Sequence, residues 1–261
     1  AGALGAALGV NAVDVAQSIA AFQWGRLLAV DAARGMALTR PVKIATPDMA
    51  DEMQNASTLI SFFSTQLTAY QNGSYAAEFT AIITPFMNWL EKTSLDADHF
   101  GCKAARALHR AMAIKDEYEV ARLLTSSRAR QNITDMAGAN AKITYHLAPP
   151  FLSWIRDKDG HPRKLKFGGW LTPILRILGK MRHLRGRWYD PFGYGHAKQQ
   201  EQRHKSAVIA WLQQLADIPQ TCPPSQLDEV LDLMLSMRGY GHVKEQNYQA
   251  ACPQIEACLE A

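Results

Sequence analysis

The sequence is poor in the motifs that hold metals, nucleotides or covalent intermediates. Its four cysteines, Cys102, Cys222, Cys252 and Cys258, form no C-x-x-C pair, which argues against iron–sulfur or zinc ligation and favours free thiols in a reducing compartment. No glycine-rich phosphate loop, no H-E-x-x-H string and no nucleophile elbow is present. We therefore expect no catalytic residue, no metal and no cofactor on this chain.

Long apolar runs are also missing. The most apolar segment, residues 1–10, is mostly Ala and Gly, and Asn11 and Asp14 follow it closely. A membrane span needs about 20 apolar residues, and a signal peptide needs a basic region in front of its apolar core. We expect a soluble, cytoplasmic protein with no membrane contact. The chain lacks an initiating Met and begins inside an apolar segment, so we expect it to be cut from a longer polypeptide.

The charge is unevenly distributed along the chain. The formal net charge is +4, but residues 156–205 hold thirteen Lys or Arg and four Asp or Glu, a local +9 that leaves −5 for the remainder. Burying unpaired charges costs several kcal/mol each, so we expect this basic stretch to be largely exposed and partly in contact with an acidic partner. A phosphate-bearing ligand and a simple solvated face are the alternatives.

Apolar residues recur at helical spacing over most of the chain. With 48% hydrophobic and 20% charged residues, the chain has enough apolar mass for a packed core. The pattern predicts helices over residues 11–31, 46–72, 74–90, 97–125, 172–183 and 196–217, one from about residue 225, and a last one after residue 241 that Pro253 bends or interrupts. Thr46-Pro47-Asp48 is a typical helix start, Ser74 is a candidate cap, and Ser225-x-x-Asp228 resembles a capping box.

The middle of the chain has a different pattern. Residues 142–147 and 163–167 are β-branched, aromatic or alternating, and residues 157–160 form a turn sequence between them. We therefore predict a mainly α fold, a multi-helix domain with a small inserted β-hairpin. We divide the chain into residues 1–40, an end piece with a linker, and residues 41–261, the helical domain.

Two candidate sites lie in the first half of the helical domain. Lys115 and Glu119 share a helix face with Arg122, so they form either a polar cluster that docks a chain or orients a ligand, or an ordinary salt-bridged surface. His146 ends the first predicted strand before Pro149-Pro150. It is either a hydrogen-bonded structural residue or an acid–base or carboxylate-binding group.

Two more candidates lie near the carboxyl end. Arg187, Tyr189, Asp190 and Tyr194 belong to an aromatic loop that either plugs the core or forms a wall for a ring-bearing substrate. Arg238, His242 and Lys244 follow or flank two glycines at the start of the last predicted helix, where backbone N–H groups attract anions; a purely structural turn is the alternative. We expect the aromatic loop, the His146 strand end and this turn to lie together on one surface.

Five segments occur here in a characteristic order: L-T-A-Y-Q-N (67–72), K-D-E-Y-E-V-A-R-L (115–123), H-L-A-P-P (146–150), D-P-F-G-Y (190–194) and R-G-Y-G-H-V-K-E (238–245). This set resembles the carboxy-terminal helical domain of indolepyruvate:ferredoxin oxidoreductases, a branch of the 2-oxoacid:acceptor oxidoreductases. Residues 21–31 are similar to the closing helix of the family's γ-type domain, most of which is absent here.

The resemblance implies a role in the oxidative decarboxylation of aryl 2-oxoacids. In that family the reaction takes place on thiamine diphosphate, electrons pass through [4Fe–4S] clusters to ferredoxin, and the acyl group is transferred to coenzyme A. Those cofactor motifs belong to other domains or to a partner subunit. The expected function of this chain is therefore non-catalytic: it supports subunit assembly or covers the active site, with the thiamine- and cluster-bearing part as its partner.

Two other functions compete with that expectation. The basic stretch favours a docking module for an acidic electron acceptor such as ferredoxin. A nucleic-acid-binding protein has only the same basic stretch in its favour, and we expect no nucleic-acid partner because no recognised binding motif accompanies it.

Overall fold

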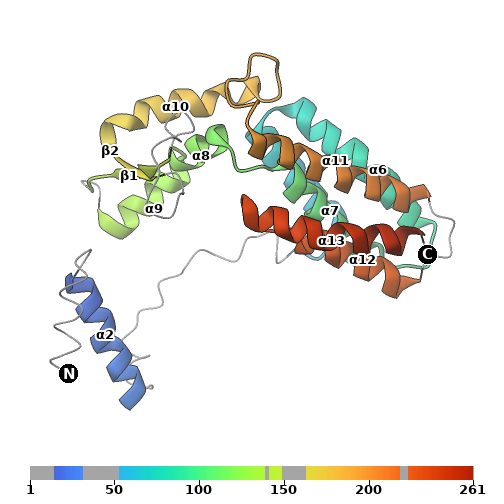
Figure 1. Ribbon diagram of the computed structural model, residues 1–261, viewed down its shortest axis with the longest axis horizontal. Coiled ribbons are helices and arrows are strands. Elements are labelled where there is room, and N and C mark those ends of the chain that lie inside the picture. Colours follow the sequence, from blue (N-terminus) through green and yellow to red (C-terminus); the bar gives the residue numbers. More distant parts are fainter. Residues whose placement is uncertain (1–14, 32–52, 139–140, 149–162, 218–222, 261) are drawn as a thin grey trace. The chain divides into compact units, whose positions relative to one another are not determined.

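The computed structural model describes residues 15–31, 53–138, 141–148, 163–217 and 223–260. Contacts divide the chain into two units, residues 1–52 and residues 53–261. The first unit contains α2 (Val15–Val30), an apolar helix on which Val30 is almost fully exposed (Figure 1). The domain boundary that we placed after residue 40 lies outside the described residues, as does Asn11, the expected cap of the first helix.

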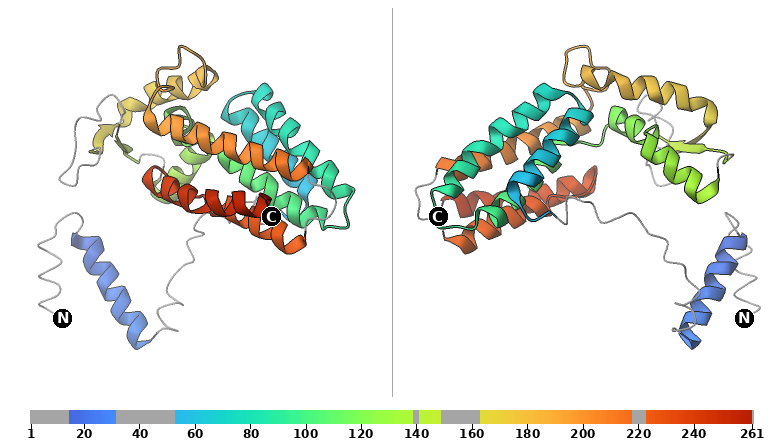
Figure 2. Two further views of the ribbon diagram at one scale, coloured as in Figure 1. Left: turned by 45° about the vertical axis from the view of Figure 1, so that its right-hand side comes forward. Right: turned by 180° about the vertical axis from the view of Figure 1, so that it is seen from behind.

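A helical bundle occupies most of the second unit (Figures 1 and 2). It consists of α5 (Ala56–Tyr70), α6 (Gly73–Glu91), α7 (Ala97–Met112), α11 (His196–Asp217), α12 (Pro224–Ser236) and α13 (His242–Glu260). α5 and α6 pack on each other and on α7, α11 lies against α6 and α7, and α12 packs between α7 and α13. Apolar side chains at helical spacing form the core, such as Leu59, Phe63 and Leu67 on α5.

A smaller group of elements, which we call the small lobe, follows α7 in the chain. It contains α8 (Glu117–Leu124), α9 (Ser127–Ala137), β1 (Thr144–Leu147), β2 (Leu165–Gly168), α10 (Thr172–Lys180), and two short 3-10 turns, η2 (Gly169–Leu171) and η3 (Met181–Leu184). β1 and β2 are antiparallel, with Tyr145 opposite Phe167. Ala121, Tyr145 and Leu175 form the centre of its core, so the hairpin is held between α8 and α10.

The fold class and the hairpin are confirmed. The two strands lie within one or two residues of the predicted ones, and the predicted turn at 157–160 is outside the described residues. The described part of the chain contains no helix that is both long and apolar enough to cross a bilayer. α13 continues through Pro253 to Glu260, so of the two effects expected of Pro253 the structure excludes an interruption; α6 likewise contains Pro85.

Three predicted helix starts have other capping groups than expected, and at two of them a side chain far along the chain takes part. Residues 53–55 are not helical, and α5 begins at Ala56, whose N–H donates to Asp98 at 2.8 Å. α6 is capped by Asn72 rather than Ser74. The capping box fails because Asp228 accepts hydrogen bonds from Lys103 and His99 of α7 instead of capping α12.

The single helix predicted over residues 97–125 is also wrong. α7 ends at Met112 and α8 starts at Glu117, with Asp116 as the N-cap of α8. The Asp116 side chain accepts a hydrogen bond from the backbone N–H of Glu119 at 2.9 Å. A continuous helix would turn this carboxylate away from its other partners, which lie in the segment after α10.

Candidate functional site

Buried polar side chains meet where the segment after α10 contacts the start of α8. We call this cluster the polar joint, and it consists of Tyr70, Asp116, Tyr118, Arg185, Asp190 and Lys198. Arg185 is 6% exposed and donates to both carboxylate oxygens of Asp116, at 2.6 and 2.8 Å. It also donates to the carbonyl oxygen of Tyr70 at 2.7 Å and lies 3.7 Å above that residue's ring. This two-pronged geometry is the one that a guanidinium group and a carboxylate prefer.

Asp116 remains ionised although it is buried. Burial acts to raise its pKa, but the hydrogen bonds and charge of Arg185 and the charge of Lys198, 3.1 Å away, outweigh burial and hold the pKa below its usual range. The N–H of Glu119 adds a further hydrogen bond. The carboxylate is therefore fully occupied and is not available for acid–base chemistry.

Asp190 fastens the aromatic loop to α8. Its side chain is fully buried and accepts hydrogen bonds from the Tyr118 hydroxyl at 2.9 Å and from the N–H groups of Phe192 and Gly186 at 3.1 and 3.2 Å. The ring of Phe192 packs edge-on against Tyr118. Burial and the neighbouring carboxylate raise the pKa of Tyr118. Asp190 thus holds the loop closed against α8.

The other residues of that loop reach solvent. Arg187 is exposed and donates to the hydroxyl of Tyr189 at 2.9 Å, and the hydroxyl of Tyr194 donates to the carbonyl oxygen of Trp188. Trp188 is 83% exposed, so this end of the loop does not plug the core. Its aromatic side chains form part of the surface beyond the end of α10.

Lys115 and Glu119 do not form one site. Lys115 is exposed and lies 4.6 Å from the centre of the Tyr240 ring, which brings the turn before α13 against the start of α8. Glu119 accepts two hydrogen bonds from Arg122, at 2.6 and 2.8 Å, and this confirms the ion pair that their spacing predicted.

The turn before α13 is not arranged as an anion site. Gly239 has a φ of +112°, a conformation that side chains other than glycine rarely adopt. Lys244 is buried and paired with Glu201 of α11, so its charge is already compensated. His242 and Arg238 are exposed. We conclude that Lys244 connects α13 to α11 and does not serve as an anion receptor.

His146 lies away from the other candidates. It is exposed on β1 opposite Lys166, and the hairpin adjoins the amino end of α10, whereas the aromatic loop follows the carboxyl end (Figure 1). The whole of α10 therefore separates them. The loop and the turn both contact residues 115–118. The prediction that His146 shares one surface with these two segments is wrong.

The family model for a family of unknown function, DUF6537, matches residues 56–257. The chain belongs to the DUF6537 family. No curated protein and no solved structure matches it. The matched region contains the bundle except the last three residues of α13, the small lobe and every residue of the polar joint, and it does not include α2.

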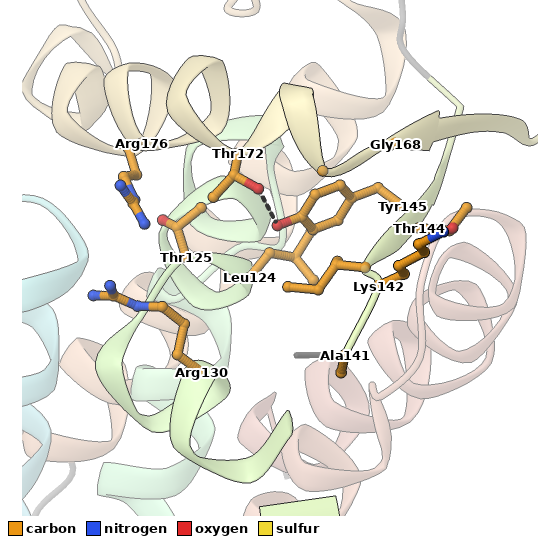
Figure 3. A pocket seen from close by; sticks show the side chains of 12 residues that line it. Leu124, Thr125, Arg130, Ala141, Lys142, Thr144, Tyr145, Gly168, Thr172 and Arg176 are labelled. Carbon is orange, nitrogen blue, oxygen red and sulfur yellow. Dashed lines mark hydrogen bonds between the residues drawn. The ribbon is translucent and has the colours of Figure 1, made fainter. Parts of the chain in front are cut away.

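The small lobe of this DUF6537 domain contains a cleft of about 610 Å³ that sequence reasoning missed. Its lining includes the apolar residues Leu124 and Ile143, the ring of Tyr145, and the side chains of Arg130 and Arg176. Figure 3 shows both arginines beside Thr125, with their guanidinium groups directed toward the same end of the cleft. A second, more open groove of about 530 Å³ lies along α11 beside Lys198 and Arg203.

α10 and the η2 turn before it present apolar side chains to solvent, which sequence reasoning also missed. Trp170 of η2 is 64% exposed, and Ile174 and Ile177, which are three residues apart on one side of α10, are 51% and 62% exposed. The opposite side carries the buried Leu175, which packs on α8 and the hairpin. The signal was present in the sequence, because residues 170–178 contain six apolar residues, more than the side that packs on α8 and the hairpin can bury.

The expectation that the basic stretch is exposed is confirmed for most of its described part. Exposed bases are Arg163, Lys164, Lys166, Arg176, Lys180, Arg187 and Arg203. Arg185 is buried in the polar joint, and Arg182, Lys198 and Lys205 are half-buried. Lys198 and Lys205 pair with Asp116 and Glu78, which lie outside the stretch.

Proposed function

We propose that this chain is a non-catalytic helical domain of an indolepyruvate-type 2-oxoacid:ferredoxin oxidoreductase subunit, located in the cytoplasm. In this proposal it supports assembly with the part of the enzyme that carries thiamine diphosphate and the [4Fe–4S] clusters, or covers that active site. The resemblance rests on five segments, and four of them contribute to one region. Tyr70, Asp116, Tyr118 and Asp190 lie in the polar joint, and Tyr240 contacts Lys115 beside it.

The exposed apolar face of α10 is the observation that carries the proposal. Six of the ten large apolar side chains that are exposed in the described part of residues 53–261 lie between residues 170 and 194. An exposed patch of this kind is typical of a protein–protein interface. Trp170, Ile174 and Ile177 form a continuous stripe of the width that a groove or a second helix would cover.

The charge around the stripe indicates what the partner surface is like. Residues 163–195 contain eight Lys or Arg and one acid, Asp190, which is buried and hydrogen-bonded. All exposed charged side chains of residues 163–195 are therefore positively charged. An apolar surface with an acidic rim complements it, and we assign that surface to the catalytic part of the same enzyme.

The test uses the complex as it is purified from its native source, with a tag on the full-length polypeptide. We expect the complex to reduce ferredoxin when indolepyruvate is supplied. Ile174→Asp and Ile177→Asp should weaken assembly with the catalytic part about tenfold or more, because each places a charge in the centre of an apolar contact. Met136→Asp is the matched control, since Met136 is 82% exposed on α9. A native complex without 2-oxoacid oxidation, or α10 variants that assemble as the control does, would overturn the proposal.

The alternative is a docking module for an acidic electron acceptor such as ferredoxin, and the exposed bases beside the stripe favour it. Lys166→Glu and Lys180→Glu should then raise the apparent KM for ferredoxin, most strongly at low salt, while assembly is unchanged. Lys92→Glu, at the exposed carboxyl end of α6, is the control. Arg185 is unsuitable for this experiment because it is buried in the polar joint.

A further inference from the structure

The cleft in the small lobe is lined by two arginines whose positive charges are not compensated by any acidic side chain among the described residues. Arg130 reaches it from α9 and Arg176 from α10, and both are exposed. Within the described ranges no acidic side chain is paired with either guanidinium group, whereas the nearby Arg122 is held by Glu119. Two like charges directed to one place repel each other, and an anion between them would remove that cost.

The hydroxyl groups beside the arginines leave a hydrogen-bond donor free. The hydroxyls of Tyr145 and Thr172 lie 2.9 Å apart and share one hydrogen bond (Figure 3). Two hydroxyl groups carry two hydrogens, and this bond uses one, so the other remains for a ligand. Thr125, whose hydroxyl donates to the carbonyl oxygen of Ala121, keeps only acceptor capacity. An oxyanion in the cleft could therefore accept hydrogen bonds from two guanidinium groups and one hydroxyl group.

The remaining walls suit an apolar body attached to that anion. Leu124 and Ile143 line the cleft together with the ring of Tyr145, and Gly168 and Gly169 add backbone to the lining. A volume of about 610 Å³ lies within the usual range for small-molecule sites. Lys142 also lines the cleft, but in Figure 3 its side chain is directed toward the end opposite the arginines.

From this geometry we propose that the cleft binds a small molecule that carries a phosphate monoester on a flat apolar body. The arginines would hold the phosphate oxygens, and Leu124, Ile143 and Tyr145 would contact the body. Two guanidinium groups balance a dianion, which favours a phosphate monoester over a carboxylate. The proposal does not depend on the assembly role, because the cleft and the apolar stripe of α10 use different side chains.

The experiment measures binding to the full chain by titration calorimetry, with phenyl phosphate as the probe. Inorganic phosphate and benzoate serve as comparison ligands. Phenyl phosphate should bind more tightly than either, and Arg130→Gln and Arg176→Gln should each weaken it about tenfold or more. Lys142→Gln, which removes the same charge from the other end of the cleft, should weaken it less than threefold. Thermal melting checks that each variant is folded.

Several results would overturn the proposal. Absence of phenyl phosphate binding, or equal weakening by Lys142→Gln and the two arginine variants, would show that the cleft has only diffuse positive charge. Benzoate that binds as tightly as phenyl phosphate would show that the site does not select a dianion. Inorganic phosphate that binds as tightly would show that the apolar walls make no contact with the ligand.

Discussion

Arg185 and Asp116 are both buried, so their charges were removed from water at a considerable cost. Each guanidinium nitrogen of Arg185 donates a hydrogen bond, to Asp116 or to the carbonyl oxygen of Tyr70, and Asp116 also accepts one from the N–H of Glu119. Such a pair adds little net stability compared with two apolar residues, but the loss of one partner leaves an uncompensated buried charge. The pair therefore fixes where the segment after α10 contacts the bundle.

Arg185→Met should lower the free energy of unfolding by about 3–5 kcal/mol, because Asp116 would lose its main partner in a buried site. Urea denaturation at pH 7 measures the loss. Lys198→Met is the matched control, since Lys198 contacts the same carboxylate at the longer distance of 3.1 Å; we expect a loss of about 1 kcal/mol. Losses of equal size in the two variants would contradict the central role of Arg185.

His109 makes the stability of the bundle depend on pH. Its ring is stacked on Phe63 with centroids 4.0 Å apart, and burial, together with the charge of Arg110, lowers its pKa to about 4. In the unfolded chain the pKa is about 6.5. The folded state therefore prefers the neutral ring, so this contribution to stability is complete above pH 6.5 and is lost as the pH falls toward 4.

The full loss from His109 is on the order of 3 kcal/mol. We expect His109→Phe to keep the stack and to show a much smaller fall in unfolding free energy between pH 7 and pH 4.5 than the unchanged chain. Urea titrations at both pH values test this. Parallel falls in the two proteins would mean that another group causes the pH dependence.

At the scale of the elements, apolar periodicity predicted the helices and strands whose positions depend on the local sequence. α5, α6 and α11 were found because their buried residues recur every three or four positions, and the hairpin was found because its pattern changes to alternation. The break between α7 and α8 was missed because its cause is tertiary. Asp116 stops the helix and binds Arg185, which lies 69 residues later.

The candidate site was predicted less well than the fold. Asp190 was singled out correctly as special, but its partner Tyr118 and the neighbouring Arg185 became visible only in three dimensions. Arg130 and Arg176 lie on different helices, and no sequence spacing brings them into one cleft. Lys244 resembled an anion-binding residue because its partner Glu201 lies 43 residues away on another helix.

α13 includes a proline that its packing tolerates. Pro253 is exposed, lacks an N–H and crowds the carbonyl group of residue 249. Pro253→Ala should therefore raise the free energy of unfolding by about 1–3 kcal/mol, read from urea or thermal unfolding. Pro224→Ala is the control, because a proline in the first turn of α12 is favourable there and its removal should bring no gain. A melting temperature that stays unchanged or falls in Pro253→Ala would refute this.

At the scale of the whole molecule, the charges and the apolar surface are distributed together. The exposed bases of residues 163–187 and the stripe of Trp170, Ile174 and Ile177 lie on the same short stretch of chain. Some acids of the bundle are paired within it, as Asp228 is with Lys103 and Glu201 with Lys244. The domain thus combines a bundle with internal ion pairs and one basic, apolar stretch suited to an acidic, apolar partner.

The second unit has its own core and should fold without the first. Contacts cluster within residues 53–261, and the family match at residues 56–257 lies entirely inside that unit. The bundle buries the large side chains of α5, α6 and α7 against α11 and α12, and Arg106 anchors the amino end of the unit by donating to the carbonyl oxygen of Met53 at 2.6 Å.

A chain that begins at residue 53 should therefore melt cooperatively, within about 4 °C of the full chain, a difference that corresponds to less than about 1–2 kcal/mol for a domain of this size. Circular dichroism and calorimetry provide the measurement. A chain that begins at residue 57 is the informative comparison, because it removes Met53 and Asn55 and with them the anchor for Arg106 and the N-cap of α5. That shorter chain should melt at a clearly lower temperature. If the chain from residue 53 is unfolded, residues 1–52 contribute to the core of the second unit and the division into two units is wrong.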